Sequence, residues 1–581
     1  MQNSAESAGQ ANEERKTMNQ KDTGTDDRTS GDVRIGVFIC DCGSNIAGHL
    51  DCSAVTEYAS TLPGVVYTKE NLYTCSESGI NEIKQAITEQ DLNRVVVASC
   101  SPRTHQPLFA SSCAEAGLNR YLFEMVNIRD QCSWVHMQES DKGTEKAKEL
   151  VRMGVAKSAH LEPQEDLVTD LTYRVLIIGG GVAGLSAAEA LGALGLEVIL
   201  VEKQPELGGL LKALHRVGPA NDPARERIEP LAEAVGQSPR ITTYLSSQVE
   251  NVGGYIGNYS VAINTGQDEL RQERVGCIVV ATGAKPFTPT GLFNYDGKTV
   301  VTQMQLERQL AMEQFNAKRV VMIQCVGART EERPFCARIC CLTAVKNAML
   351  IKERDPSADV HVLYRDMQMY GTEREKLYWD ARGMGVKFDI YDPARPPRVE
   401  NGKVSFDHAI LGEEVTLDSD LVVLSTPLEA QDDAQRISQM MRVPTDQNKF
   451  FLEAHAKLRP LDFAADGIFV CGSARYPATA EEARSQGIGV ASRVSTILFK
   501  DKLISSAIVA EIDEQSCVGC MGCIDVCPYQ AISYDPGSGV CRINTVLCKG
   551  CGSCAAACPS ESVQLKGYKP RQLLSQIRAA A

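Results

Sequence analysis

Short apolar runs that end in a turn and lead into a helical repeat recur along this chain. Clear examples begin near residues 33, 173 and 318. Uninterrupted apolar runs of this length predict strands that are buried on both faces, as in parallel sheets covered by helices. We therefore expect an α/β protein, and a length of 581 residues predicts several domains.

Neither the first residues nor the longest apolar stretch indicates export or membrane insertion. Residues 1–32 are polar almost throughout, which predicts a disordered tail without a secretory signal. The apolar stretch 175–201 contains Glu189, Glu197 and several glycines. A strand, a turn, a helix and a second strand explain this stretch better than a transmembrane helix does.

The run that begins at Tyr173 has the pattern of a dinucleotide-binding unit. An apolar strand leads to glycines in the spacing G-x-G-x-x-G, a helix follows, and a second strand ends in an acid. The glycines allow a pyrophosphate to approach the helix N-terminus closely, and the acid accepts hydrogen bonds from ribose hydroxyls. The cofactor residues expected here are Gly179, Gly181, Gly184, Glu202 and Lys203.

Two later segments favour FAD as the dinucleotide. One is an apolar strand that ends at Thr282 and Gly283, and the other is a strand that turns at Gly472 and Ser473 before a helix. Both resemble the closing segments of flavoproteins with two dinucleotide folds, such as thioredoxin reductase. In those enzymes an Asp after the glycine contacts the flavin side, and Ser473 stands at that position here.

A second nucleotide-like unit is expected between residues 318 and 366, nested within the first, but its glycine fingerprint is missing. Four cysteines occupy the turn where a pyrophosphate would lie, namely Cys325, Cys336, Cys340 and Cys341. We infer that NAD(P)H does not bind there and that an iron-sulfur cluster exchanges electrons with the flavin. The irregular spacing leaves open a vicinal disulfide between Cys340 and Cys341, or buried free thiols.

The cysteine spacing near the C-terminus is that of a two-cluster bacterial ferredoxin. Two runs have the form C-x-x-C-x-x-C-x-x-x-C-P, and the fourth thiolate of each run reaches the other cluster. A pair of zinc ribbons is the alternative, although zinc does not require this shared pattern. We assign one [4Fe–4S] cluster to Cys517, Cys520, Cys523 and Cys558, and a second to Cys548, Cys551, Cys554 and Cys527.

The N-terminal α/β domain carries further cysteines in loops and at strand ends. They are Cys40, Cys42, Cys75, Cys100 and Cys132. Loops at one end of such a domain can bring ligands together. The spacing alone does not distinguish a metal site from structural cysteines.

Composition narrows the class of protein. There are 22 cysteines and no secretory signal, which indicates metal binding in a reducing cytoplasm rather than disulfides. The formal net charge of −14 argues against a nucleic-acid partner.

From Val33 onward the chain resembles the heterodisulfide reductase A-subunit family, the iron-sulfur flavoproteins of anaerobic electron-transfer complexes. The resemblance is carried by IGVFICDCGSNIAG, VVVASCSPRTHQPLF, LNRYLFEMVNIRDQCSWVHM, the FAD fingerprint, QCVGAR…FCARICC and the ferredoxin tail. It implies a cluster on the four nested cysteines and another in the N-terminal domain, without selecting four ligands there.

The chain also departs from the family pattern. Residues 206–230 contain no cysteine, and residues 253–277 leave no room for the ferredoxin module that many members insert. This is a trimmed form, which puts in question the family's electron bifurcation, in which a flavin hydride equivalent is split between ferredoxin and a disulfide.

We therefore predict an iron-sulfur flavoprotein electron-transfer subunit of a heterodisulfide-reductase-like complex. Its partners are the other subunits and a ferredoxin-, hydrogenase- or dehydrogenase-linked donor, and no side chain stands out as an acid, base or nucleophile. The alternatives are an NAD(P)H oxidoreductase like the small subunit of glutamate synthase, a non-catalytic scaffold, or the same module in a quinone-linked or acyl-CoA-reducing complex. The predicted domains are a tail (1–32), an N-terminal α/β domain (33–140), a helical linker (141–172), an FAD-binding fold (173–317 and 431–500), a nested fold (318–430) and an α+β ferredoxin domain (501–581).

Overall fold

The computed structural model describes residues 32–266 and 270–580, so almost all of the predicted tail lies outside the described residues. The chain forms two compact units. One contains the described residues up to Leu167 together with those from Ile504 onward, and the other is Val168–Leu503. The short strands β5 (Leu167–Thr169) and β26 (Leu503–Ser505) lie where the chain passes between the units.

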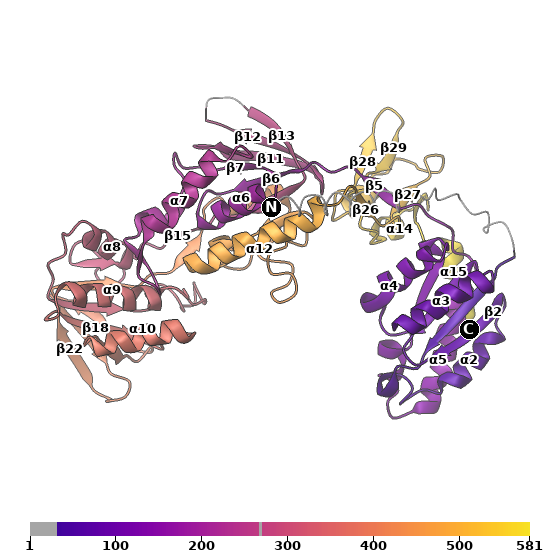
Figure 1. Ribbon diagram of the computed structural model, residues 1–581, viewed down its shortest axis with the longest axis horizontal. Coiled ribbons are helices and arrows are strands. Elements are labelled where there is room, and N and C mark those ends of the chain that lie inside the picture. Colours follow the sequence, from indigo (N-terminus) through magenta and orange to yellow (C-terminus); the bar gives the residue numbers. More distant parts are fainter. Residues whose placement is uncertain (1–31, 267–269, 581) are drawn as a thin grey trace, which may run out of the picture. The chain divides into compact units, whose positions relative to one another are not determined.

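The N-terminal domain is a four-stranded parallel sheet in the order β2-β1-β3-β4 (Figure 1). Its two inner strands, β1 and β3, are buried at every position, as their apolar sequence predicts. The strands are β1 (Ile35–Cys40), β2 (Val65–Asn71), β3 (Arg94–Ser99) and β4 (Phe123–Asn127). The helices are α2 (Cys52–Ser60) and α5 (Ser140–Ser158) on one face, and α3 (Glu77–Glu89) and α4 (Pro102–Glu115) on the other.

Helix α5 corrects the predicted linker 141–172. Its residues Ala147, Val151 and Val155 are buried against the sheet together with α2. The helix is therefore part of the N-terminal domain, and its Lys157 is buried in an ion pair with Glu124 at 2.8 Å. Its apolar face repeats every three to four residues, which is the spacing of a helix that packs on a core.

The ferredoxin domain consists of two antiparallel strand pairs and two short helices. The pairs are β27 (Ala510–Ile512) with β30 (Val563–Leu565) and β28 (Ile532–Asp535) with β29 (Val540–Ile543), and the helices are α13 (Gly522–Asp525) and α14 (Ser553–Ala557). The last helix, α15 (Pro570–Ala580), packs on α5 instead of on the cysteine-bearing strands (Figure 1). The Gln572 side chain donates to the His160 carbonyl at 2.9 Å, and Lys569 pairs with Glu162 at 2.8 Å.

The second unit contains a five-stranded parallel sheet that carries the glycine fingerprint. Its order is β10-β7-β6-β14-β25, with β6 (Arg174–Ile178), β7 (Glu197–Val201), β10 (Ile241–Tyr244), β14 (Cys277–Val280) and β25 (Ile468–Val470). One face is covered by α6 (Val182–Ala193), α7 (Ala224–Gln237) and α12 (Ala480–Leu498). The other face is covered by the antiparallel sheet of β11 (Gln248–Tyr255), β12 (Asn258–Asn264) and β13 (Leu270–Val275), and by α11 (Ala434–Met441).

The nested fold repeats this plan with a second five-stranded parallel sheet, in the order β16-β23-β17-β18-β19. Its strands are β16 (Val300–Thr302), β17 (Arg319–Ile323), β18 (Asp359–Tyr364), β19 (Lys387–Ile390) and β23 (Leu421–Leu424). Helices α8 (Gln303–Ala311), α9 (Cys340–Arg354) and α10 (Thr372–Gly383) cover one face. The strands β20 (Arg398–Glu400), β21 (Lys403–Asp407) and β22 (Glu414–Asp418) cover the other.

The boundary between the two folds differs from the predicted one. Strand β16 pairs with β23 and α8 packs on the nested core, so the nested fold begins near residue 300 and not at 318. A strand of three residues gives too short a pattern to be recognised in the sequence. Two connecting strands, β15 (Ala284–Pro286) and β24 (Leu428–Ala430), pair with each other where the chain enters and leaves the nested fold.

A search of the described residues for a helix that is long and apolar enough to cross a membrane finds none.

The packing of α12 on α6 generates a first prediction. A Cβ at Gly487 would lie 2.3 Å from the Ala183 carbonyl oxygen, whereas a Cβ at Gly236 on α7 meets nothing within 4 Å. We expect Gly487→Ala to destabilise the protein by about 1–3 kcal/mol through overpacking. Gly236→Ala should stabilise it by up to about 1 kcal/mol, because alanine is the better helix former.

The measurement is the thermal unfolding midpoint of each variant. A lower midpoint for Gly487→Ala and an unchanged or higher one for Gly236→Ala would support the close helix contact. The same change of unfolding midpoint in both variants would contradict the close contact between α12 and α6.

Candidate functional site

A cavity of about 640 Å³ lies in the second unit, with walls from both the glycine-bearing fold and the nested fold. This volume is typical of cavities for cofactors and other small ligands. Seven of the nine residues predicted to bind FAD line it, namely Gly179, Gly181, Glu202, Lys203, Thr282, Gly283 and Ser473. The other two, Gly184 and Gly472, pack behind its wall.

The three glycines of the fingerprint have different physical tasks. Gly179 has a φ of +110°, and a Cβ there would lie 2.3 Å from the Ala281 carbonyl oxygen. A Cβ at Gly184 would lie 1.9 Å from the Gly179 carbonyl oxygen, so this residue allows the helix to approach the strand. Gly181 precedes α6, lines the cavity, and has open space where a side chain would project. The positive helix end next to Gly181 is suited to a pyrophosphate.

Glu202 closes the turn in addition to facing the cavity. Its carboxylate accepts hydrogen bonds from the backbone N–H of Gly180 at 2.6 Å and of Gln204 at 2.8 Å. The side chain of Lys203 donates to the Gln431 side-chain oxygen at 2.9 Å. Glu202 therefore fixes the loop that faces the expected ribose, while Lys203 contacts the segment that returns from the nested fold.

The closing segments are arranged partly as the sequence predicts. The Thr282 hydroxyl is buried on the cavity wall and has no hydrogen-bond partner among the described residues. The backbone N–H of Gly472 donates to the Gln486 side chain at 2.9 Å, so this amide already has a partner within the protein. Ser473 reaches the cavity, and its hydroxyl oxygen accepts from the Ala478 N–H at 3.3 Å.

These features fit a bound flavin dinucleotide. A buried hydroxyl without a partner costs free energy unless a ligand completes its hydrogen bond. The unfilled space next to Gly181 lies where the pyrophosphate of such a cofactor is expected. Gly179, Gly181, Glu202, Thr282 and Ser473 are therefore the residues that would hold it.

A buried ion pair on the same wall was not foreseen from the sequence. Lys346 of α9 pairs with Glu307 of α8, and both side chains are almost fully buried. Glu307 also accepts from the His215 N–H at 2.9 Å, and Lys346 donates to the Arg216 carbonyl at 2.9 Å. Burial lowers the pKa of Lys346, whereas Glu307 acts to raise it. The pair joins the nested fold to the glycine-bearing fold, and its partners are too far apart in sequence to form a recognisable motif.

The four cysteines of the nested fold lie at the carboxyl end of β17 and the beginning of α9. The thiol of Cys340 hydrogen-bonds to that of Cys341, which raises the pKa of Cys340 and lowers that of Cys341. Burial, with the charges of Cys341 and Cys336, raises the pKa of Cys325 to about 11. The four thiols are thus electrostatic neighbours, and Cys340 also lines the cavity.

Two arginines and several hydrogen-bonding groups surround these cysteines, and Asp366 pairs with Arg329 at 2.7 Å. The charges of Arg329 and Arg365 act to lower the pKa of Cys325. The Tyr391 hydroxyl donates to the Gln324 carbonyl at 3.1 Å. The side-chain amide of Gln324 is buried, and neither its nitrogen nor its oxygen has a partner within the described part of the chain. A polar pocket of this kind suits an anionic group bound by thiolates.

The ferredoxin cysteines lie in the turns before α13 and α14, within these short helices, and directly after them. Burial and the charges of Cys548 and Cys527 raise the pKa of Cys554, so these three predicted ligands of one cluster are neighbours. Burial acts to raise the pKa of Cys558, but hydrogen bonds from Ser562 and Ser560 lower it to about 7. Burial, with Cys541 and Cys520 nearby, raises the pKa of Cys523 to about 12.

Four of the five N-terminal cysteines lie near one another at the carboxyl edge of the first sheet. Burial raises the pKa of Cys100, and the charges of Cys40 and Cys75 raise it further. Burial also raises the pKa of Cys40, and the charge of Cys42 raises it further. The fifth, Cys132, points elsewhere, since its thiol donates to the Gly143 carbonyl at 3.0 Å inside the core.

The same edge carries several buried polar atoms that lack partners among the described residues. They are Asp41 Oδ1, Asn71 Oδ1, Thr74 Oγ1 and Ser99 Oγ. They lie at or just after the carboxyl ends of β1, β2 and β3, near these four cysteines. Unpaired buried polar atoms indicate a missing partner, such as a ligand.

Within residues 32–266 and 270–580, no three His, Cys, Asp or Glu side chains are arranged so that they could hold a single metal ion. The thiols of the predicted sets are neighbours without converging on one point. The ligand assignments therefore stay predictions that rest on spacing, proximity and donor chemistry.

Two family models match the chain and define its class. The pyridine nucleotide-disulphide oxidoreductase model matches residues 173–487, and the 4Fe-4S dicluster domain model matches residues 516–562. Together they confirm the predicted fold class, a two-dinucleotide-fold oxidoreductase core followed by a two-cluster ferredoxin domain.

The chain belongs to the heterodisulfide reductase A-subunit family. It is 36% identical over 597 residues to the second iron-sulfur A-subunit of CoB–CoM heterodisulfide reductase from Methanopyrus kandleri, covering 86% of this chain and 91% of the relative. It is 34% identical over 651 residues to the A-subunit of the H(2):CoB-CoM heterodisulfide,ferredoxin reductase from Methanothermobacter thermautotrophicus, covering 95% and 98%. Among solved structures, thioredoxin reductase from T. acidophilum aligns with a TM-score of 0.40 and 16% identity over 57% of this chain and 100% of that chain.

The open space at Gly181 generates a second prediction. Its φ of −79° is accessible to any residue, so a side chain there needs no backbone change. We expect Gly181→Val to fold with a nearly unchanged melting temperature when flavin-free, because a Cβ at this position meets nothing within 4 Å. Its affinity for FAD should fall by about tenfold or more, since overpacking against the cofactor costs about 1–3 kcal/mol.

The measurement is FAD titration followed by flavin fluorescence, with Gly236→Ala as the matched control. Unchanged FAD affinity in Gly181→Val would place the cofactor elsewhere.

Proposed function

We propose that this chain is an electron-transfer subunit that moves electrons between FAD and iron-sulfur clusters for partner subunits. The observation that supports it best is Cys340, which lines the cavity that fits FAD and belongs to the cysteine quartet of the nested fold. A cluster bound by this quartet would lie next to the flavin. Bound FAD exchanges electrons in pairs or singly, and each cluster carries one electron at a time.

The residues of the chain bind and orient these groups. The glycines and Thr282 would hold the dinucleotide, and the Lys346–Glu307 pair keeps a fixed charge arrangement on the cavity wall. Arg329 and Arg365 would stabilise the anionic cluster bound by the nested cysteines. The two C-terminal clusters would be held by the cysteine sets that the spacing assigns.

Several features of the nested fold argue against NAD(P)H as the electron donor. Cys325 stands with a φ of +62° where the first turn of a nucleotide fold normally places glycine. At Gly327 the Phe287 ring fills the space, since a Cβ there would lie 2.3 Å from the ring. Thiols and an aromatic ring therefore occupy the turn in which a glycine-rich loop would leave space for a pyrophosphate.

We also propose a further cluster in the N-terminal domain with Cys40, Cys42, Cys75 and Cys100 as its ligands. The mutual influence of these thiols and the unpaired polar atoms around them support the choice. Cys132 is left out because its thiol is hydrogen-bonded inside the core. The total is then one FAD and four [4Fe–4S] clusters per chain.

The terminal chemistry is assigned to partner subunits in this proposal. The relatives are named for reduction of a CoB–CoM heterodisulfide and, in some cases, of ferredoxin. By analogy we propose a thiol–disulfide reaction in a partner, with electrons arriving from a ferredoxin- or hydrogenase-linked donor. In flavin-based bifurcation, the two electrons of the reduced flavin would pass to two different acceptors.

The proposal predicts the iron content of cysteine variants purified without oxygen. The wild-type chain should hold about sixteen irons, and Cys336→Ser and Cys75→Ser should each lose about four. Cys132→Ser should keep the wild-type content, because its thiol bonds to Gly143. Iron, sulfide and FAD are counted on the same samples.

A wild-type content of only about eight irons would contradict both irregular clusters. Loss of iron in Cys132→Ser equal to that in Cys75→Ser would contradict the choice of N-terminal ligands.

A further inference from the structure

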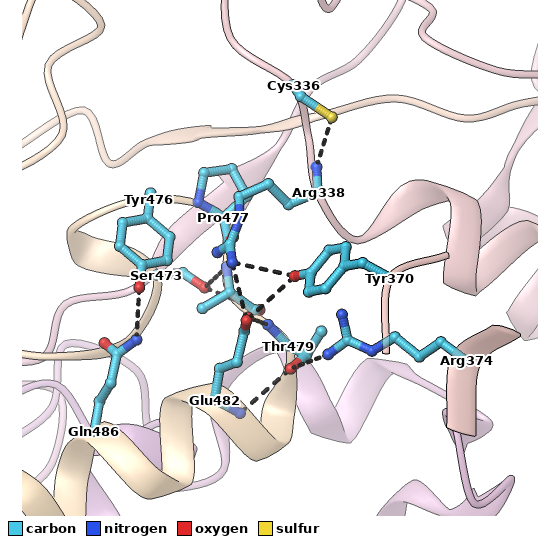
Figure 2. Close-up of polar contacts among 11 residues, drawn as sticks. Cys336, Arg338, Tyr370, Arg374, Ser473, Tyr476, Pro477, Thr479, Glu482 and Gln486 are labelled. Carbon is cyan, nitrogen blue, oxygen red and sulfur yellow. Dashed lines mark hydrogen bonds and ion pairs between the residues drawn. The ribbon is translucent and has the colours of Figure 1, made fainter. Parts of the chain in front are cut away.

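One arginine of the cysteine-bearing segment makes several polar contacts with the flavin-binding fold, close to where Phe335 packs on Phe450. Arg338 lies between Cys336 and Cys340, and its guanidinium donates to the Pro477 carbonyl at 3.0 Å and to the Glu482 carboxylate at 2.9 Å (Figure 2). It also stacks on the Tyr476 ring, 4.5 Å from the ring centre. Pro477, Glu482 and Tyr476 all belong to the flavin-binding fold.

The backbone of Arg338 contacts the cysteine segment itself. Its N–H donates to Cys336 Sγ at 3.3 Å, and its φ is +60°. A left-handed conformation costs a non-glycine residue about 1–2 kcal/mol, a cost that glycine would avoid. The side-chain contacts of Arg338 offset this cost, which gives a physical reason for an arginine at this position.

The partners of Arg338 are continuous with the wall of the flavin cavity. Glu482 lies in the first turn of α12 and caps it together with Thr479, which lines the cavity. The Gln486 side chain accepts from the Gly472 N–H and donates to the Tyr476 hydroxyl at 3.1 Å. Contacts therefore run without interruption from the closing turn at Gly472 to Cys336. Figure 2 shows the Gln486–Tyr476 and Arg338–Cys336 hydrogen bonds of this series.

Two further residues of the nested fold contact Arg338 and its partners. The Tyr370 hydroxyl accepts from Arg338 at 3.2 Å and donates to Glu482 at 3.3 Å. Arg374 of α10 stacks on Tyr370 and reaches the Thr479 hydroxyl at 3.5 Å. Burial acts to raise the pKa of Glu482, but the Thr479 N–H and Arg338 lower it, so the carboxylate stays charged near neutral pH.

We propose that Arg338 is a positioning residue, a clamp that fixes the cysteine segment 325–341 against the flavin-binding fold and so keeps Cys340 on the cavity wall. The proposal rests on the proposed function in one respect, that this segment holds a cluster. The chain enters and leaves the nested fold at the β15–β24 pair, and the Phe335 ring packs on Phe450 of the flavin-binding fold. The clamp and the buried Lys346–Glu307 pair add polar contacts that hold the two folds together.

The test uses hydrogen exchange of the backbone amides of residues 325–341 in the complete protein, read by mass spectrometry. We expect Arg338→Gln to exchange about tenfold faster or more, because hydrogen bonds to charged groups contribute about 1.5–3 kcal/mol. Arg338→Gly removes the backbone cost together with the clamp and should also exchange faster. Glu482→Gln, which weakens the clamp from the other fold, should show a smaller increase.

The matched control is Arg382→Gln on α10, which removes the same charge from a residue that stacks on Tyr378 and Trp379 and donates to the Tyr378 hydroxyl at 3.0 Å, all within its own helix. Its exchange in residues 325–341 should equal that of the wild type. The proposal would be overturned if hydrogen exchange in residues 325–341 were unchanged in Arg338→Gln and unchanged or slower in Arg338→Gly. The side chain of Arg338 would then not hold the segment, and the residue would matter only for the backbone conformation of the turn.

Two further readouts separate the clamp from the proposed function. Iron and FAD contents of Arg338→Gln should equal those of the wild type, while electron exchange between flavin and cluster after rapid reduction should slow. Arg338→Lys, which keeps the charge, should restore part of this rate. Absence of iron on the four cysteines in the wild type would overturn the proposed function, and the exchange result would still decide whether Arg338 holds the segment in place.

Discussion

The positive N-terminal end of helix α9 is the constraint on which the nested site depends. In a nucleotide fold this end attracts the pyrophosphate. Here the first two residues of α9 are Cys340 and Cys341. A helix N-terminus also stabilises a thiolate, and clusters are bound by thiolates. The same electrostatic feature therefore suits either occupant, and the cysteines, with Phe287 packed at the turn, favour the cluster.

This position links the chemistry of the two folds. The cavity that fits FAD takes one wall from the glycine fingerprint and another from the beginning of α9. A group held by Cys340 and its neighbours would lie next to a flavin bound in this cavity. Arg338, which precedes α9, and Lys346, which lies within it, both contact the flavin-binding fold. The N-terminal domain has a similar arrangement. Its cysteines lie at the carboxyl edge of a parallel sheet, among polar atoms that lack partners within the described part of the chain.

The parts that were predictable from the sequence are those encoded locally. The fingerprint at Gly179–Gly184 and the ferredoxin spacing each need only a short stretch of chain, and both lie within the segments that the family models match. Long-range pairing was not predictable in this way. The docking of α5 and α15, the membership of β16 in the nested sheet, and the Lys346–Glu307 pair all depend on contacts between distant segments. Cys132 and Gly472 show a related limit, since their residue types agree with ligand and cofactor roles but their hydrogen bonds are already made within the protein.

The central claim is that metal-bound sulfur occupies the turn where a nicotinamide cofactor would dock. The most direct measurement is the anomalous scattering of iron in crystals of the protein purified without oxygen. The account predicts an iron peak surrounded by the sulfurs of Cys325, Cys336, Cys340 and Cys341, beside bound FAD. Iron confined to the C-terminal domain, with those four thiols free or joined as a disulfide, would contradict it.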